Sequence, residues 1–213
     1  MLDLCRNHNL AEFYKKDDGM KPAIKLHLGC GTKRLDGWVN VDKYPAMNPD
    51  MVHDLESLPW PWPDDSVDEV VMSHVLEHLG QETRVFLGIM QEIYRICRHD
   101  AVIHVVVPHP RHDDFINDPT HVRPITPEVM SLFDRSINME WRRLGAANSQ
   151  LALALGVDFV IRNVSMTPAP EWLNRLQKGE VTMIELERAR LSQINVIREI
   201  AIRMAVRKGS SAN

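Results

Sequence analysis

Histidine and acidic side chains gather in two stretches of this sequence. One is "SHVLEHL", residues 73–79, and the other is the Pro-, His- and Asp-rich segment 108–127. Histidine titrates near neutral pH and can take a proton from an acceptor hydroxyl. We therefore expect general acid–base chemistry in these stretches, with His78, Asp118 and His121 as the catalytic candidates.

Other polar side chains of the two stretches are candidates for binding an acceptor molecule. His74, His112 and Arg123 are the expected substrate-binding residues, and Arg123 would orient an anionic group of the acceptor. A structural interpretation stays open beside this one. Asp118 and the neighbouring prolines can stabilise a turn, and Arg123 can pair with a surface carboxylate.

A glycine turn follows the first apolar run of the chain, in "LHLGCGTKRLDGWVNVD", residues 26–42. Dinucleotide sites aim a helix N-terminus at the pyrophosphate, and their ribose-binding acid lies ~20 residues beyond the glycines. Here "TKRLDGW" is too short for a crossover helix, and Asp42 comes early. The turn favours a ligand with a ribose and no pyrophosphate, so a nicotinamide-dependent oxidoreductase is a disfavoured alternative.

The elements that would position these residues form an α/β pattern. Helical spacing of apolar residues over 80–100 predicts an amphipathic helix. β-branched or alternating runs predict strands at 23–29, 37–42, 51–55, 67–74 and 101–110. Such an order favours a parallel sheet, whose carboxyl edge would carry the segment 108–127 as a long loop.

The C-terminal part continues the same pattern. Thr126–Pro127 resembles a helix start, and 157–166 reads as a strand. A helix is expected over 181–193, followed from about Asn195 by a last strand that returns antiparallel into the sheet.

We expect one domain at 23–208, with an N-terminal extension at 1–22 and a tail at 209–213. The extension is predicted to be helical near residues 10–16. His27 and His104 fall inside predicted strands and are expected to be ordinary sheet residues.

Composition narrows the class of protein. The chain has 213 residues, 44% of them hydrophobic, and a formal net charge of -4, which argues against a nucleic-acid partner. Its three cysteines are unevenly spaced and cannot form a metal thiolate cluster alone. No apolar run approaches the ~20 residues of a membrane span. We expect a cytoplasmic protein, and a homodimer is an open alternative to a monomer.

Three segments together carry a family resemblance: "LHLGCGTKRLDGWVNVD", "HDLESLPWPWPDDSVDEVVMSHVLEHL" and "EIYRICRHDAVIHVVVP". They resemble class I S-adenosylmethionine-dependent methyltransferases, near the type 11 methyltransferase domain. The resemblance implies a Rossmann-like sheet of seven strands, mostly parallel with an antiparallel last strand. It also implies S-adenosyl-L-methionine as the cofactor.

Site residues follow from the resemblance and from the predicted strand ends. The turn residues Gly29, Cys30 and Gly31 would face the methionine part of the cofactor, and Asp42 would accept hydrogen bonds from its ribose hydroxyls. The other expected contacts are Asp54 and Leu55 at the adenine and Ser73 at the sulfonium side. Trp60 and Trp62 are expected to pack a turn.

The expected reaction is methyl transfer to an oxygen of a small-molecule or saccharide acceptor. That acceptor class is inferred from related sequences of surface-polysaccharide or phage context. A non-catalytic S-adenosylmethionine-binding protein of the same fold is the alternative of a different class.

Metal use is a further alternative. Some metal-dependent methyltransferases carry a Glu–His pair at the position of Glu77–His78, so a metal-assisted methyltransferase is open. These enzymes often have another glutamate where this chain has His74, and our expectation is that no metal is bound. In the simpler interpretation "HVLEHL" starts a helix, with Glu77 at its positive end.

Overall fold

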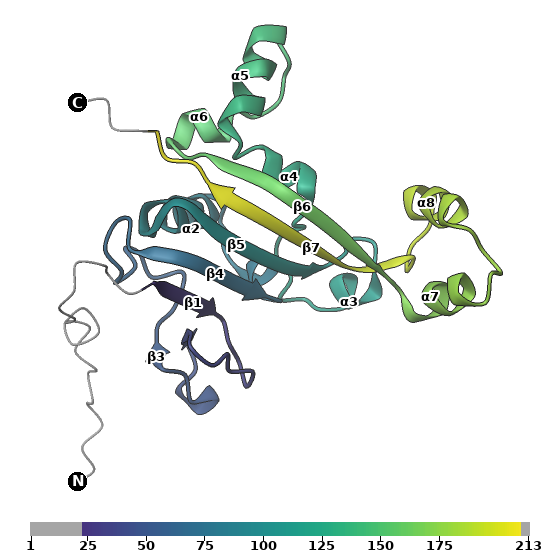
Figure 1. The fold of residues 1–213 in the computed structure, drawn as a ribbon, viewed down its shortest axis with the longest axis horizontal. Helices are drawn as coiled ribbons and strands as arrows, with labels where there is room; N and C mark the ends of the chain where they lie inside the picture. The colour runs from purple at the N-terminus through teal and green to yellow at the C-terminus, as the bar shows by residue number, and fades with distance from the viewer. Residues whose placement is uncertain (1–22, 210–213) are drawn as a thin grey trace.

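The computed structural model describes residues 23–209 (Figure 1). The expected N-terminal extension, residues 1–22 with its helix near 10–16, lies outside the described residues. So do residues 210–213 of the expected tail. Among the described residues, no helix is both long enough and apolar enough to cross a membrane.

The described residues form seven strands, seven α-helices and two 3-10 helices. The strands are β1 (Ile24–Leu28), β2 (Val39–Asp42), β3 (Met51–Val52), β4 (Val67–Ser73), β5 (Cys97–Pro108), β6 (Phe159–Pro168) and β7 (Ile197–Val206). The α-helices are α2 (Thr83–Ile96), α3 (Asp113–Ile116), α4 (Pro127–Ser131), α5 (Arg135–Leu144), α6 (Leu151–Leu155), α7 (Pro170–Gln177) and α8 (Met183–Ser192). Two short 3-10 helices are η1 (Pro45–Met47) and η2 (Leu76–His78).

The seven strands form one sheet in the order β3-β2-β1-β4-β5-β7-β6. β1 pairs in parallel with β2 and β4, β2 with β3, and β4 with β5. β7 lies between β5 and β6 and runs antiparallel to both. The expected Rossmann-like sheet, mostly parallel with an antiparallel last strand, is confirmed.

The strand order reverses at β1, because β2 lies on one side of it and β4 on the other. Open α/β sheets bind ligands beyond the carboxyl ends of their strands at such a switch point. The glycine turn follows β1, while β2 ends at Asp42 and β4 ends at Ser73. The topology therefore brings these three chain segments to one edge of the sheet.

The connection from β1 to β2 contains no helix, as its length predicts. It continues the sheet instead: the Cys30 N–H donates to the Val41 carbonyl oxygen at 2.9 Å. Asn40 holds the rest of the turn, since its Oδ1 accepts the Leu35 N–H at 2.8 Å and its Nδ2 donates to the Leu35 carbonyl at 3.1 Å. The ligand edge at β1 is thus shaped by backbone turns and not by a helix terminus.

The two faces of the sheet differ in burial. Along β5, Ile103 and Val105 are fully buried, whereas Val102 and His104 between them are only half-buried. The buried face packs against α2, whose buried side chains are Phe86, Ile89, Met90, Ile93 and Ile96. Six apolar positions predict this helix, and all of them except the half-buried Val85 are core residues.

The half-buried face carries polar pairs. Glu69 binds Lys25 Nζ at 2.9 Å and His104 Nε2 at 3.0 Å. On the same face, Nδ1 of His27 lies 3.1 Å from Oδ1 of Asn40. Both histidines are sheet residues with polar partners, as expected from the sequence.

Trp60 and Trp62 are buried in the core and pack edge to face, with ring centroids 6.0 Å apart. Their expected packing role is confirmed.

Several helices depart from the expectation. The segment 108–127 is not entirely a loop, because the single turn α3 lies within it, and α5, α6 and α7 were not anticipated. α5 buries only Asn138, but Ile137, Trp141 and Leu144 recur at helical spacing, so its sequence does carry a helical signal that our expectation left out. Figure 1 shows α5 and α6 at one end of the long strands β6 and β7, and α7 and α8 at the other.

Elsewhere the predicted boundaries are close. The helix start at Thr126 is confirmed, since the Thr126 hydroxyl accepts the Val129 N–H at 3.2 Å, although α4 already ends at Ser131. The expected strand at 51–55 is shorter, because only Met51–Val52 pairs with β2.

Two neighbouring residues of β5 test the one-sided core. Ile103→Ala is expected to lower the free energy of unfolding by about 2–5 kcal/mol, because it leaves a cavity in a fully buried position. Val102→Ala should cost clearly less, because its side chain is already half-exposed. Denaturant titration of both variants measures the difference, and equal losses would contradict the assignment of the core to one face.

Candidate functional site

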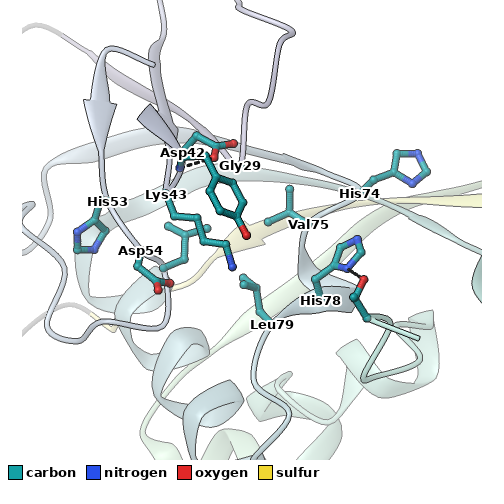
Figure 2. Close-up of a pocket in the computed structure, with 12 residues that line it drawn as sticks. Gly29, Asp42, Lys43, His53, Asp54, His74, Val75, His78 and Leu79 are labelled. Carbon is teal, nitrogen blue, oxygen red and sulfur yellow. Dashed lines mark hydrogen bonds between the residues drawn. The ribbon is translucent and has the colours of Figure 1, made fainter. Parts of the chain in front are cut away.

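A cavity of about 370 Å³ opens at the carboxyl edge of β1, β2 and β4 (Figure 2). Its size lies within the usual range for small-molecule sites. It is lined by Gly29, Asp42, Lys43, Tyr44, His53, Asp54, Leu55, His74, Val75, His78, Leu79 and Thr120. Residues from both sides of the switch point therefore share one cavity.

Four of the seven expected cofactor-binding residues line this cavity: Gly29, Asp42, Asp54 and Leu55. The other three, Cys30, Gly31 and Ser73, are not among its lining residues. Cys30 is buried behind the turn, where burial raises the pKa of its thiol. Gly31 contributes through its backbone, which binds the Asp42 side chain.

Gly29 brings the backbone close to the cavity in a conformation that suits glycine. Its φ is +65°, and a Cβ built on it would lie 2.4 Å from Cγ2 of Val75, which is another lining residue. Side chains rarely adopt this backbone region, and the space that one would need is already filled. Gly31 also has a positive φ, +50°, but no heavy atom of the described residues lies within 4 Å of its built Cβ, apart from its chain neighbours.

Asp42 joins the two ends of the β1–β2 connection. Its Oδ2 accepts the Gly31 N–H at 2.9 Å, and its Oδ1 accepts the Tyr44 N–H at 2.9 Å. The carboxylate is buried, and Figure 2 shows it on the cavity wall beside Gly29. Two of its roughly four lone-pair positions are thus used, and the rest can accept hydrogen bonds from a ligand.

Lys43, His53 and Asp54 form the part of the cavity below β2. Figure 2 shows the Lys43 side chain extending past Asp54 toward Leu79. The His53 Nε2 is buried without a hydrogen-bond partner among the described residues, and burial lowers the pKa of this imidazole. Neither Lys43 nor His53 is among the expected site residues, although Lys43 directly follows Asp42 and His53 directly precedes Asp54.

The other end of the cavity carries His74, His78 and Thr120. The backbone of His74 has a φ of +55°, and its ring bridges two carboxylates, with Nε2 3.0 Å from Glu199 Oε1 and Nδ1 3.5 Å from Glu77 Oε1. The Glu77 carboxylate beside it raises the pKa of His74. Glu199 comes from β7, so its role could not be inferred from a local motif.

The expected catalytic residues come together at this end. The rings of His78 and His121 have centroids 4.5 Å apart, and His121 stacks on Phe115 with centroids 5.2 Å apart. Asp118 accepts a hydrogen bond from the Thr120 hydroxyl at 2.6 Å, and the same hydroxyl lies 2.9 Å from His78 Nδ1. His78, Asp118 and His121 therefore belong to one cluster although they come from distant segments, but of the three only His78 lines the cavity.

Two expected substrate-binding residues lie elsewhere. His112 is buried and caps α3, since its Nδ1 accepts the Asp114 N–H at 3.0 Å. Arg123 donates to the Gly80 carbonyl at 2.9 Å, and its guanidinium lies over the Phe86 ring at 4.4 Å. Both are engaged in local structure, and neither lines the cavity.

The stretch "HVLEHL" does not start an α-helix. Leu76–His78 forms the 3-10 turn η2, and Glu77 within it is fully buried. The expectation that Glu77 only favours a helix end is wrong, because no α-helix begins at this residue and α2 begins at Thr83.

The comparisons with known proteins agree with this architecture. Residues 26–105 match a family model described as a methyltransferase domain. No curated protein matches the chain. The matched segment runs from β1 into β5 and contains all seven expected cofactor-binding residues.

Solved structures resemble the chain in fold. One is a SAM-dependent methyltransferase from Archaeoglobus fulgidus, with 17% identity, a TM-score of 0.54, and coverage of 92% of this chain and 89% of that one. Another, from Listeria monocytogenes and described as an S-adenosylmethionine-dependent methyltransferase, has 13% identity, a TM-score of 0.51 and coverage of 87% and 92%. At these identities the likeness concerns the fold alone.

A pair of glycine variants tests the close approach at the turn. Gly31→Ala is expected to cost about 1–2 kcal/mol of unfolding free energy, because alanine is strained at positive φ. Gly29→Ala carries the same strain and should lower the unfolding free energy by about 1–3 kcal/mol more, because Val75 must move. Thermal or denaturant unfolding measures both, and equal losses would mean that Val75 does not restrict this position.

Proposed function

We propose that this chain, whose residues 26–105 match a methyltransferase-domain model, is an S-adenosylmethionine-dependent methyltransferase that methylates a hydroxyl of a small polar molecule or saccharide. The observation that carries the proposal is the single cavity that joins the glycine turn and Asp42 at one end to His74, His78 and Thr120 at the other. Such a cavity can hold a methyl donor and an acceptor end to end.

The cavity residues fit the cofactor. A buried carboxylate with free lone pairs, at Asp42, suits the two hydroxyls of a ribose. The glycine turn leaves no room for a Cβ at Gly29, so the cofactor would meet backbone there. No pyrophosphate has to be held, which agrees with a β1–β2 connection that contains no helix.

The part of the cavity that is lined by Lys43, His53 and Asp54 would bind the adenine. Leu55 offers an apolar surface, and Asp54 can accept hydrogen bonds from an exocyclic amino group. Lys43 lies across this region and would have to move aside or pair with the cofactor carboxylate when the site is filled.

At the acceptor end, the residues of the chain would position a hydroxyl and remove its proton. When bound, S-adenosylmethionine supplies the methyl group of its sulfonium, and the sulfur keeps the electrons of the broken C–S bond. His78 and His121 offer imidazole nitrogens that can receive the hydroxyl proton, and Asp118 orients Thr120 beside them. This division of roles supports oxygen as the methylated atom.

The same polar lining supports an uncharged, hydroxyl-rich acceptor. His74, His78 and Thr120 can each exchange hydrogen bonds with sugar hydroxyls. Arg123 is occupied with Phe86 and Gly80, so we no longer assign it to an anionic acceptor group.

Asp42→Asn tests the cofactor assignment. Binding of S-adenosylhomocysteine, measured by calorimetry, should weaken at least about tenfold, because one charge-assisted hydrogen bond to ribose becomes a neutral one. Asp36→Asn is the matched control, since Asp36 is an exposed acid of the same connection and should bind as the wild type does. Unchanged binding by Asp42→Asn would refute the ribose assignment.

The acceptor class needs a transfer experiment. The protein is incubated with methyl-labelled S-adenosylmethionine and a panel of saccharides and hydroxylated metabolites, and the products are located by mass spectrometry. Label on an oxygen supports the proposal, and label only on nitrogen or carbon contradicts it. Cofactor binding without transfer to any of these acceptors would favour a non-catalytic binding protein.

A further inference from the structure

Glu77 is a buried carboxylate whose charge is poorly compensated. Its side chain has no solvent exposure, and neither oxygen makes a hydrogen bond to any residue that the structure describes. Nδ1 of His74 lies 3.5 Å from Glu77 Oε1 and forms an ion pair with it but no hydrogen bond. An ionised carboxylate is costly to bury in this way, so the arrangement calls for a positive partner.

The backbone keeps this carboxylate beside the segment that bears His121. The N–H groups of Val122 and Arg123 donate to the Glu77 carbonyl oxygen at 2.9 and 3.3 Å. One side-chain oxygen of Glu77 and one nitrogen each of His78 and His121 consequently lie within 4.8 Å of one another. The three groups are close enough to bind a single ion.

The same nitrogen, Nε2, makes no hydrogen bond to a described residue on either imidazole, although Asp118 Oδ2 lies 3.7 Å from that of His121. His121 Nδ1 lies 2.9 Å from the Phe115 carbonyl oxygen, which can only accept, so Nδ1 carries the proton. The Thr120 hydroxyl gives its proton to Asp118, so it accepts from His78 Nδ1. Each ring thus keeps a lone pair on Nε2, as metal-binding histidines do when their other nitrogen donates to an oxygen.

We propose that Glu77, His78 and His121 bind a divalent cation at the acceptor end of the cavity. Two neutral imidazoles and one carboxylate suit first-row ions such as Zn²⁺ or Mn²⁺ and leave coordination positions open. The ion would supply the positive charge that Glu77 lacks. The competing explanation is a protonated His74 paired with Glu77, which would compensate the charge in part but leaves both carboxylate oxygens without a hydrogen bond to the described residues.

The ion also specifies the acceptor, and this part rests on the proposed function. His78 belongs both to the ion site and to the cavity lining. An acceptor with two adjacent oxygens, such as a vicinal diol, could bind the open positions through both. With the ion bound, His78 and His121 act as its ligands and not as the base; a coordinated hydroxyl ionises more readily and releases its proton to solvent. Its oxygen then forms the new O–CH₃ bond as the methyl group leaves the sulfonium sulfur, which keeps the C–S electrons.

Ion binding can be measured without any acceptor. The full-length protein is freed of metal with a chelator and titrated by calorimetry with Zn²⁺ or Mn²⁺, and the wild type should bind one ion at this site. Glu77→Gln and His121→Ala should weaken binding by more than about 100-fold, because even the loss of groups that only orient ligands costs 10–100-fold. His104→Ala is the matched control: its histidine also pairs with a glutamate, Glu69, but lies on the sheet face, so binding should be unchanged.

Thermal unfolding separates a ligand from a structural residue. In the presence of chelator, Glu77→Gln should unfold at the same temperature as the wild type or a higher one, because it removes a poorly compensated charge. Added Zn²⁺ should raise the midpoint of the wild type only. A lower midpoint for Glu77→Gln in chelator, or equal ion affinity in wild type and variant, would overturn the proposal.

The test is independent of the proposed methyl transfer. S-adenosylhomocysteine binding reports on the cofactor site and should survive the Glu77→Gln substitution. If the cofactor binds and no ion does, only the cation site fails. If the ion binds and S-adenosylhomocysteine does not, the proposed function fails instead. Transfer to a vicinal diol that continues at full rate in chelator would refute the role given to the ion.

Discussion

The bridge that Asp42 makes across the β1–β2 connection is the interaction on which the ligand edge depends. One carboxylate oxygen holds the N–H of Gly31 after β1, and the other holds the N–H of Tyr44 after β2. A helix would normally fix the distance between two such strands. Here a buried side chain does so, and it remains available to a ligand because its lone pairs outnumber its backbone partners.

The acceptor end depends on a second kind of constraint, the meeting of η2 with the segment 118–123. Backbone hydrogen bonds from Val122 and Arg123 to Glu77 bring the segment to the turn, and side-chain hydrogen bonds through Thr120 then orient His78. Polar groups so arranged have one fixed tautomer and few alternative partners. This is why the cluster can be interpreted chemically and not only as a group of neighbouring histidines.

The sheet supports both ends from one side. Its buried face packs against α2 and carries most of the apolar core, while the other face keeps Glu69 and its partners half-exposed. Small shifts in the core would therefore be transmitted to the strand ends, because close-packed interiors do not absorb changes of volume. At the cofactor end, the cavity is held by the paired strands β1, β2 and β4. At the acceptor end, it is held by hydrogen bonds of the loop that follows β5.

Local sequence patterns determined much of this protein. Alternation along "AIKLHLG" and "REIAIRMAV" predicted β1 and the antiparallel β7, and the short "TKRLDGW" excluded a crossover helix. The motif order predicts a methyltransferase, and residues 26–105 match a family model described as a methyltransferase domain. α5 is absent from the prediction although the sequence carries its signals, the helical spacing of Ile137, Trp141 and Leu144 and the capping Asp134.

Only the tertiary structure decided which polar residues share a site. Sequence spacing placed Arg123 and His112 with the acceptor, but packing against Phe86 and capping of α3 occupy them. Conversely, the sequence suggests that Glu77 is an acid at a helix end. In the structure it is buried near His121, which lies more than forty residues further along the chain. Strand order and loop hydrogen bonds bring such pairs together, and neither is encoded in the local spacing of residues.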